Sequence, residues 1–340
     1  MRFCLNAVPM LSTAENRTWW QACERAGIER IGLGDTPALA RELYVSLTDC
    51  ALTTERIGIM PSVTNPVSRD PAVTAAALYS LAELAPGRLC ALGIGTGDSA
   101  LWGTGIRMAS VGVLREYILA VRGLLQGKEV AYQERRFRAA WASAPVDIPI
   151  YVACAGPKVL HMAAQVADGL ILAMGYAPEN LEFVHETILA ACAEIGRDPA
   201  DLDLWWNASA QFAGSVDEAL EAGVQLGASW LTAGGAQGKQ IPDRYRAPLI
   251  EFTRDAHDLE FMYRTPDRNT ILMQRARALG IYDWLLERTA RLWGTPADIA
   301  RRLRELRSLG LDNWVFTTGI NNIRAIEELT GEVMPLLAEA

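Results

Sequence analysis

Short apolar segments alternate with longer amphipathic segments along most of the chain. The short segments have the length and composition of strands buried on both faces, and the longer ones repeat apolar residues at helical spacing. Eight strands are predicted, at residues 2–8, 30–35, 56–64, 88–96, 149–156, 169–175, 202–213 and 313–318. Helices are predicted at residues 14–26, 71–85, 111–125, 158–167, 179–195, 216–226 and 297–308. Eight strands that alternate with helices predict an α/β fold, a (β/α)8 TIM barrel.

One long interval interrupts this alternation between the seventh and eighth strands. Residues 231–292 combine a glycine-rich stretch with several apparent helices. A connection of this length in a compact domain is either a functional lid or a helical elaboration of the barrel rim, and both interpretations stay open. Since no low-complexity linker divides the chain, residues 1–340 are predicted to form a single barrel domain that carries this insertion.

Composition and charge narrow the possible partners. Half of the residues are hydrophobic and the mean hydropathy is +0.09, which favours a folded, well-buried protein over a disordered one. The net charge of −8 and the absence of a Lys/Arg block argue against nucleic acid as a partner. The apolar runs are far shorter than the roughly 20 residues that cross a bilayer, and the N-terminus has no signal-peptide pattern. A cytoplasmic protein that does not enter a membrane is therefore expected.

Metal chemistry and triad hydrolysis both lack their components in this sequence. The six cysteines are scattered without a CxxC pair, so we expect reduced core residues. The three histidines, His161, His185 and His257, have neither metal-ligand nor triad-like spacing. No metal site is predicted, and the chemistry is expected to come from a bound organic cofactor.

The candidate site residues follow predicted strands, because a TIM barrel places its functional groups at the C-terminal ends of its strands. Asp35 and Asp98 are the candidate catalytic carboxylates, and a carboxyl acts as a general acid near neutral pH only if burial raises its pKa. Lys158 stands at a predicted helix N-terminus that could hold a phosphate. Ordinary turn and packing roles remain open for residues 62–65, 95–98 and 153–158.

The glycine-rich segment LGIGTGDS, residues 92–99, resembles a dinucleotide loop only superficially. A Rossmann fingerprint needs an acidic residue about 20 positions later, at the end of the next strand. A predicted helix occupies that region here, so the Rossmann interpretation is rejected. The small residues instead let the backbone approach a flat ligand.

Several motifs in order resemble the luciferase-like monooxygenase superfamily, and most closely its methylenetetrahydromethanopterin-reductase-like branch. They are TERI (54–57), SVTNPVSRDPAVTAAAL (62–78), LAPGRLCALGIGTGDS (84–99) and PIYVACAGPKVLHMAAQVADGLIL (149–172). The similarity is dense over residues 30–175 and returns at WGTPAD (293–298) and WVFTT (314–318).

This resemblance implies a barrel, usually a homodimer, that binds reduced FMN or coenzyme F-420 (F420) above its strands. It implies a non-prolyl cis peptide at Ser62-Val63, a ring contact by Thr96, a proton-handling role for Asp98, and a cofactor phosphate or tail at residues 153–156. The expected cofactor-binding residues are Ser62, Val63, Thr64, Asn65, Thr96, Gly97, Ala153, Cys154, Ala155, Gly156, Lys158, Met174 and Gly175.

Two positions depart from the family pattern and leave the reaction open. The common Arg-His before proline is Arg69-Asp70 here, and the acid at position 98 is Asp rather than Glu. The favoured function is a reduced-FMN-dependent monooxygenase acting on a small organic substrate, with a separate flavin reductase as a further expected partner. The alternatives are F420-dependent hydride transfer and a flavin-binding barrel without turnover.

Overall fold

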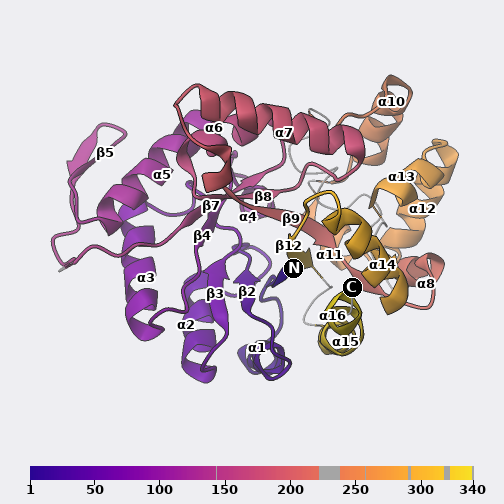
Figure 1. Cartoon of the computed structure of the whole chain (residues 1–340), viewed down its shortest axis with the longest axis horizontal. Coiled ribbons are helices and arrows are strands. Elements are labelled where there is room, and N and C mark those ends of the chain that lie inside the picture. Colours follow the sequence, from indigo (N-terminus) through magenta and orange to yellow (C-terminus); the bar gives the residue numbers. More distant parts are fainter. Residues whose placement is uncertain (143, 222–237, 257, 290–291, 318–321, 339–340) are drawn as a thin grey trace.

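Eight parallel strands form the centre of the computed structural model (Figure 1). The model describes residues 1–340 except 143, 222–237, 257, 290–291, 318–321 and 339–340. The strands are β1 (Arg2–Ala7), β2 (Arg30–Leu33), β3 (Gly58–Pro61), β4 (Leu92–Ile94), β7 (Ile150–Cys154), β8 (Gly169–Leu172), β9 (Asp203–Ser209) and β12 (Asn313–Thr317). Their order is β3, β2, β1, β12, β9, β8, β7, β4. Bridges between Ile59 and Leu89 and between Thr64 and Ile94 bring the β3 and β4 segments together. The predicted (β/α)8 barrel is confirmed.

Helices follow the strands and cover the outside of the barrel. The main ones are α1 (Thr13–Arg25), α2 (Leu43–Thr53), α3 (Pro71–Leu84), α5 (Val111–Leu125), α6 (Pro157–Val166), α7 (Pro178–Ala193) and α14 (Pro296–Arg307), with α15 (Ile323–Glu328) and α16 (Met334–Ala338) near the C-terminus. The outward side chains of the strands pack against these helices in one large apolar core. No helix in the described part of the chain is long and apolar enough to cross a membrane.

Three predicted strands have the wrong boundaries, and the one predicted at residues 88–96 is only Leu92–Ile94. The strand predicted at residues 56–64 is only Gly58–Pro61, because the chain leaves the regular ladder at the next peptide. The strand predicted at 202–213 divides into β9 and β10 (Gln211–Phe212). The reason is a change of partner: β9 pairs with β12, whereas β10 pairs with β11 (Trp293–Gly294). The helix predicted at 216–226 is α8 (Val216–Glu221), and its remaining residues lie outside the described part.

The sequence analysis did not predict two elements between barrel strands. Helix α2 is one of them, and its almost entirely uncharged sequence hides the amphipathic pattern that marks an ordinary surface helix. The other is the antiparallel pair β5 (Val130–Tyr132) and β6 (Arg135–Phe137), which follows α5. These strands of three residues are too short for a clear alternating pattern.

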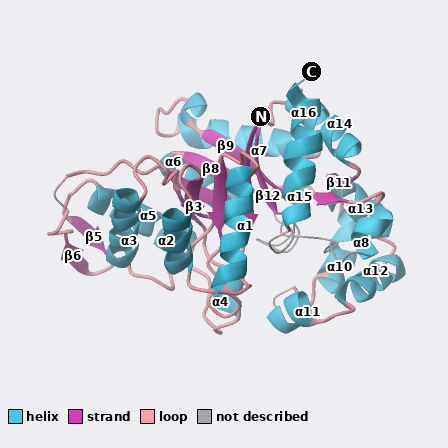
Figure 2. Cartoon of the chain, turned by 90° about the horizontal axis from the view of Figure 1, so that it is seen from below, coloured by secondary structure: helices cyan, strands magenta, loops and turns pink. Residues whose placement is uncertain are grey.

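A group of helices between β9 and β12 forms a second apolar core. It comprises α10 (Asp243–Phe252), α11 (Leu259–Arg264), α12 (Arg268–Ala278) and α13 (Tyr282–Thr289). Their buried residues form a cluster separate from the main core. Figure 2 shows this helical group on the side of the barrel opposite the β5–β6 hairpin. It falls within the predicted insertion at 231–292, of which residues 231–237, 257 and 290–291 lie outside the described part.

The barrel interior has an apolar middle and a polar floor. The middle is filled by Cys4, Met60, Ala91, Tyr151, Ile171, Trp205 and Val315. At the floor, the Asp203 carboxylate accepts hydrogen bonds from the Tyr151 hydroxyl at 2.6 Å and from Trp205 Nε1 at 2.9 Å. Asp203 also pairs with Arg2 at 2.5 Å. These contacts fill the N-terminal end of the barrel, and in a TIM barrel the functional groups lie at the opposite, C-terminal ends of the strands.

Candidate active site

A buried carboxylate joins the ends of β2 and β3. Asp35, which is 3% exposed, follows β2. Its Oδ2 accepts a hydrogen bond from the Thr64 hydroxyl at 2.7 Å and another from Nη1 of Arg69, with which it forms an ion pair. The backbone N–H of Asp35 points to the Val63 carbonyl oxygen at 3.4 Å. The structure therefore brings three predicted site residues together and adds Arg69 to them.

The peptide between Ser62 and Val63 is cis, as the family resemblance implies. The N–H of Ser62 donates to the Leu33 carbonyl oxygen at 2.7 Å, which attaches this segment to the end of β2. Its side chain lies over Gly32, where a Cβ atom would come within 2.5 Å of Ser62 Cβ. Glycine at position 32 therefore provides the space for Ser62 at the barrel mouth.

Thr64 and Asn65 connect β3 to the end of β4. The N–H of Thr64 donates to the Gly93 carbonyl oxygen, and the N–H of Gly95 donates to the Thr64 carbonyl oxygen, both at 3.0 Å. The Asn65 carbonyl Oδ1 accepts from the N–H groups of Val67 and Ser68, and thereby folds the loop that follows. The predicted residues of the two strand ends therefore share one continuous hydrogen-bonded wall.

The residues after Gly95 form the rim of the mouth. The Thr96 carbonyl oxygen accepts from the N–H of Ala109 at 3.0 Å. Gly97 adopts a φ of +90°, and a Cβ there would meet the Leu101 side chain. Asp98 is exposed, and its carbonyl oxygen accepts from the first turns of α4 (Ser99–Trp102). The role of Asp98 as a proton-handling acid stays a prediction.

The end of β7 leads into a helix N-terminus that no side chain caps. Ala153 faces the barrel interior, whereas the thiol of Cys154 is buried and donates to the Val152 carbonyl oxygen. Burial raises the pKa of this thiol. The N-cap residue of α6 is Gly156, which cannot cap the first turn, and the exposed Lys158 stands in that turn. Uncapped amides and a nearby cation form a suitable anion-binding position.

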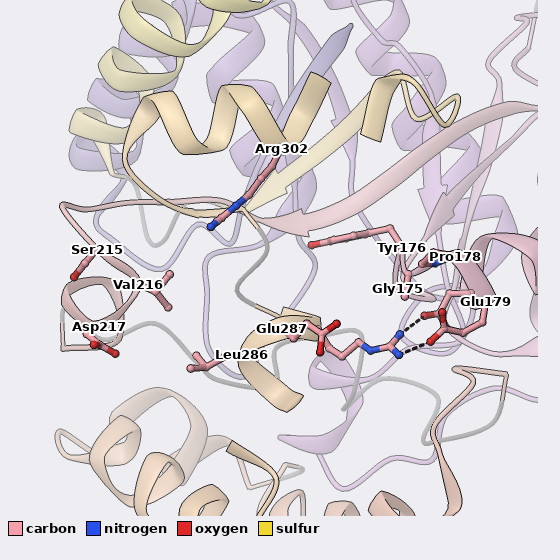
Figure 3. Close-up of a pocket in the computed structure, with 13 residues that line it drawn as sticks. Gly175, Tyr176, Pro178, Glu179, Ser215, Val216, Asp217, Leu286, Glu287 and Arg302 are labelled. Carbon is pink, nitrogen blue, oxygen red and sulfur yellow. Dashed lines mark hydrogen bonds and ion pairs between the residues drawn. The ribbon is translucent and has the colours of Figure 1, made fainter. Parts of the chain in front are cut away.

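The end of β8 continues from the end of β7, because the N–H of Ala173 donates to the Cys154 carbonyl oxygen at 2.8 Å. Met174 is buried, and Gly175 lines a cavity of about 570 Å³ on the flank of the barrel (Figure 3). The cavity lies between the start of α7 and the helices α8, α13 and α14, with the ion pair Arg288–Glu179 on its wall. Tyr176, which also lines it, packs on the Trp314 ring. We place the candidate active site at the mouth, where the buried polar groups converge.

Two buried polar groups were missed by the sequence analysis. Asn6 follows the inward-facing Cys4 by two positions on β1, and its Oδ1 is buried without a hydrogen-bond partner. Lys239 is 1% exposed, and burial lowers its pKa to about 7. Its neighbour Gly238 lies against Pro157 and Met174, beside the ends of β7 and β8. The signal available for Asn6 was a polar residue inside an otherwise apolar strand.

These features fit a flat ring with a phosphate-bearing tail. Gly95 and Ala153 are small residues above the interior layer, and a Cβ on Gly95 would lie 3.5 Å from both Ala153 Cβ and Val63 Cγ2. The unpartnered Asn6 Oδ1 needs a hydrogen-bond donor that the described protein does not supply. The uncapped start of α6 suits a phosphate. The residues present therefore fit a flavin or deazaflavin nucleotide.

The described cysteines and histidines do not gather at this site. All six cysteines are free thiols, five of them buried. His161 lies on α6 and pairs at 3.0 Å with Glu194, which is 33 residues later in the chain. This pair lies on the partly exposed surface. In the described residues, no group of three or more His, Cys, Asp or Glu side chains is placed to hold a metal ion.

A (β/α)8 barrel with buried polar residues at the C-terminal ends of its strands has the architecture of the TIM-barrel enzymes. The family model described as luciferase-like monooxygenase matches residues 3–313. The chain therefore belongs to the luciferase-like monooxygenase family, and it is an oxidoreductase.

Three similar proteins show how this chain relates to that family. It is 27% identical to a 5,10-methylenetetrahydromethanopterin reductase from Archaeoglobus fulgidus over 99% of the chain and 100% of the relative. It is 33% identical to an F420-dependent glucose-6-phosphate dehydrogenase from Beutenbergia cavernae over 64% of the chain and 70% of the relative. The solved coenzyme F420 dependent tetrahydromethanopterin reductase from Methanopyrus kandleri has the same fold, with a TM-score of 0.74, 22% identity and 98% of each chain covered.

Proposed function

We propose that this protein is an F420-dependent oxidoreductase that transfers a hydride between the deazaflavin and a small organic substrate. The observation that carries the proposal is the pair of relatives with F420-linked or methylenetetrahydromethanopterin names, one of them similar over the whole chain. The polar wall formed by Asp35, Thr64 and Ser62 at the barrel mouth supports it, because a ring lying there would be shielded from water on one side.

When bound, the deazaflavin supplies a ring carbon that accepts or donates a hydride. The Ser62–Thr64 segment and Ala153 would form the surface against which the ring lies. The uncapped start of α6, with Gly156 and Lys158, would bind the phosphate of its side chain. Asn6 would accept a hydrogen bond from the bound ligand. The barrel floor excludes water from below, so that the substrate would approach from the open side of the mouth.

The reduced-FMN-dependent monooxygenase remains the second candidate, because the family model itself carries that description. Both cofactors have a tricyclic ring and a phosphate, so the mouth residues suit either of them. The names of the relatives favour the deazaflavin. In the F420 proposal no flavin reductase takes part: oxidised F420 accepts the hydride when the substrate is oxidised, and reduced F420, supplied by another F420-dependent dehydrogenase, donates it when the substrate is reduced.

Turnover without oxygen tests this proposal. Purified protein would be mixed anaerobically with F420 and with one substrate at a time: a secondary alcohol, glucose-6-phosphate, or, with reduced F420, methylenetetrahydromethanopterin. The expected result is a protein-dependent change of the deazaflavin absorbance with one of these compounds. Oxygen-dependent turnover with reduced FMN, and none with F420, would contradict the proposal.

We also propose that two copies of this chain associate through α2 and α3, which lie side by side at the edge of the barrel (Figure 1). Both helices carry apolar side chains outward: Val45 and Leu52 on α2 are 67% and 65% exposed, and Val73 on α3 is 56% exposed. Exposed apolar side chains on adjacent helices are typical of a subunit interface rather than of a free surface.

The double substitution Val45→Lys/Leu52→Lys is therefore expected to convert the dimer to a monomer, because it places two buried cations in the interface. Sedimentation velocity measures the mass. Ile250→Lys on α10 is the matched control, since Ile250 is 72% exposed but lies in the helical group on another side of the barrel. A wild type that sediments as a monomer, or a double variant that stays dimeric, would refute this interface.

A further inference from the structure

One carboxylate oxygen holds both ends of the loop beside the cis peptide. The loop begins at Thr64, whose hydroxyl donates to Asp35 Oδ2 at 2.7 Å, and it ends at Arg69, whose Nη1 donates to the same oxygen. Between these ends, Asn65 bonds to Val67 and Ser68 and folds the loop upon itself. The loop is thus compact by its own contacts, and Asp35 makes the side-chain hydrogen bonds that join its two ends to the end of β2.

Arg69 connects this carboxylate to the start of α2. Its Nη2 donates to Glu42 Oε1, and Glu42 is also the N-cap of α2, accepting from the N–H of Val45 at 2.7 Å. The Arg69 guanidinium lies over the Tyr44 ring at 5.1 Å, and its side chain is 13% exposed. Glu42, Arg69 and Asp35 therefore form a row of alternating charges from the start of α2 to the barrel mouth. Arg69 is the middle member of this row.

The charge on Asp35 needs this arginine. The Asp35 side chain is 2% exposed, and a buried carboxylate without a cation is strongly disfavoured. Burial also disfavours the charged form of Arg69, but Asp35 and Glu42 outweigh this effect, so that the pKa of Arg69 is raised above its usual value. Arg69 therefore stays protonated at any pH at which the enzyme would work.

We propose that Arg69 is a positioning residue for hydride transfer, which keeps Asp35 ionised and thereby fixes Thr64, the end of the Ser62–Thr64 segment against which the cofactor ring lies. The contact with the ring rests on the proposed function, whereas the hold of Arg69 on Asp35 does not. Arg69 itself bonds to Asp35 and Glu42 and acts on the cofactor only through the loop.

The other titratable groups around Arg69 do not prevent a measurement of pH dependence near neutral pH. They are Asp35, Glu42, Tyr44, Tyr117 and Asp70. Burial raises the pKa of both tyrosines, so they stay neutral between about pH 5 and about pH 8. A variant that lacks the Asp35 carboxyl removes its contribution and leaves those of Glu42 and Asp70 in place.

The test compares wild type, Arg69→Met and the double variant Arg69→Met/Asp35→Asn over about pH 5 to about pH 8. In Arg69→Met, the folded protein can replace the lost cation by protonating the buried carboxyl. The folded state then binds more protons than the unfolded state, so stability falls as pH rises. The melting temperature, relative to wild type, should therefore decrease toward pH 8, and F420 affinity should drop about tenfold there and recover at pH 5.

The double variant leaves a neutral amide that still accepts from Thr64. We expect F420 affinity within about threefold of wild type and no pH dependence of the difference in melting temperature. Arg122→Met is the matched control, because it removes an arginine that pairs with Asp168 at 3.0 Å just before β8, at the opposite end of the barrel. It should change neither F420 affinity nor the pH profile.

Two results would overturn the proposal. One is a decrease in melting temperature and F420 affinity in Arg69→Met that is equal at every pH. The other is a double variant whose F420 affinity is no higher than that of Arg69→Met. A wild type that binds no F420 would contradict the proposed function instead. The melting curves need no cofactor, so they would still decide whether Arg69 keeps Asp35 ionised.

Discussion

Alanine at position 93 is expected to destabilise the protein by roughly 2–4 kcal/mol and to abolish cofactor binding. Gly93 lies on β4 beside β3, and its missing Cβ would overlap the Pro61 backbone carbonyl oxygen and come within 3.2 Å of Val63 Cγ1. A backbone atom cannot rotate away as a side chain can. The added methyl group must therefore push the β3 and β4 ends apart, where Thr64 and Gly93 are hydrogen-bonded at 3.0 Å.

Gly95→Ala on the same segment is the matched control for this prediction. Its Cβ would lie 3.5 Å from Ala153 Cβ and from Val63 Cγ2, which is ordinary van der Waals contact. Urea denaturation should give nearly wild-type stability for Gly95→Ala and a large loss for Gly93→Ala. Equal stabilities of the two variants would mean that the β3 and β4 ends are not packed as described.

Asp203→Ala is expected to cost about 1–3 kcal/mol, because the carboxylate is the shared acceptor of the barrel floor. Without it, the Tyr151 hydroxyl and Trp205 Nε1 lose their acceptor inside the barrel, and Arg2 loses its ion pair. Burial, together with this hydrogen bond to Asp203, raises the pKa of Tyr151 to about 12. The guanidinium groups of Arg2 and Arg30 stack over the Trp205 ring at 4.9 and 4.6 Å. Because these residues contact one another, the loss of Asp203 is expected to destabilise all contacts of the barrel floor together.

Asp203→Asn keeps one of the two acceptor oxygens and should lose less stability than Asp203→Ala. Thermal unfolding, followed by tryptophan fluorescence, measures both variants, and for a chain of this size each kcal/mol shifts the melting temperature by about 2 °C. If Asp203→Ala had the same melting temperature as the wild type, the hydrogen bonds of Asp203 would not stabilise the barrel floor.

The barrel could be predicted from the sequence because buried parallel strands leave a strong signal. Strands such as β8, with four consecutive buried apolar residues, stand out from their helical surroundings. The strand ends were less predictable. The partner exchange at Ala210 depends on Trp293, more than eighty positions away, and no local pattern contains it.

From the sequence, the site residues that directly follow single strands could be predicted, but the contacts between different strand ends could not. Asp35, Ser62, Thr64 and Ala153 were expected at the mouth, and the structure places them there. The role of Arg69 was hidden, because its two partners stand 34 and 27 positions earlier in the chain. The acid role of Asp98 stays a prediction, and its exposure at the rim could not be inferred from the sequence, since burial is a property of the folded loop.

Titration of the purified protein with F420, FMN and reduced FMN in parallel, followed by tryptophan quenching and cofactor absorbance, tests the central claim most directly. The account predicts saturable binding of F420 that is at least about tenfold tighter than that of either flavin. Tighter binding of reduced FMN, with protein-dependent reoxidation by oxygen, would contradict it and would restore the monooxygenase as the function of this barrel.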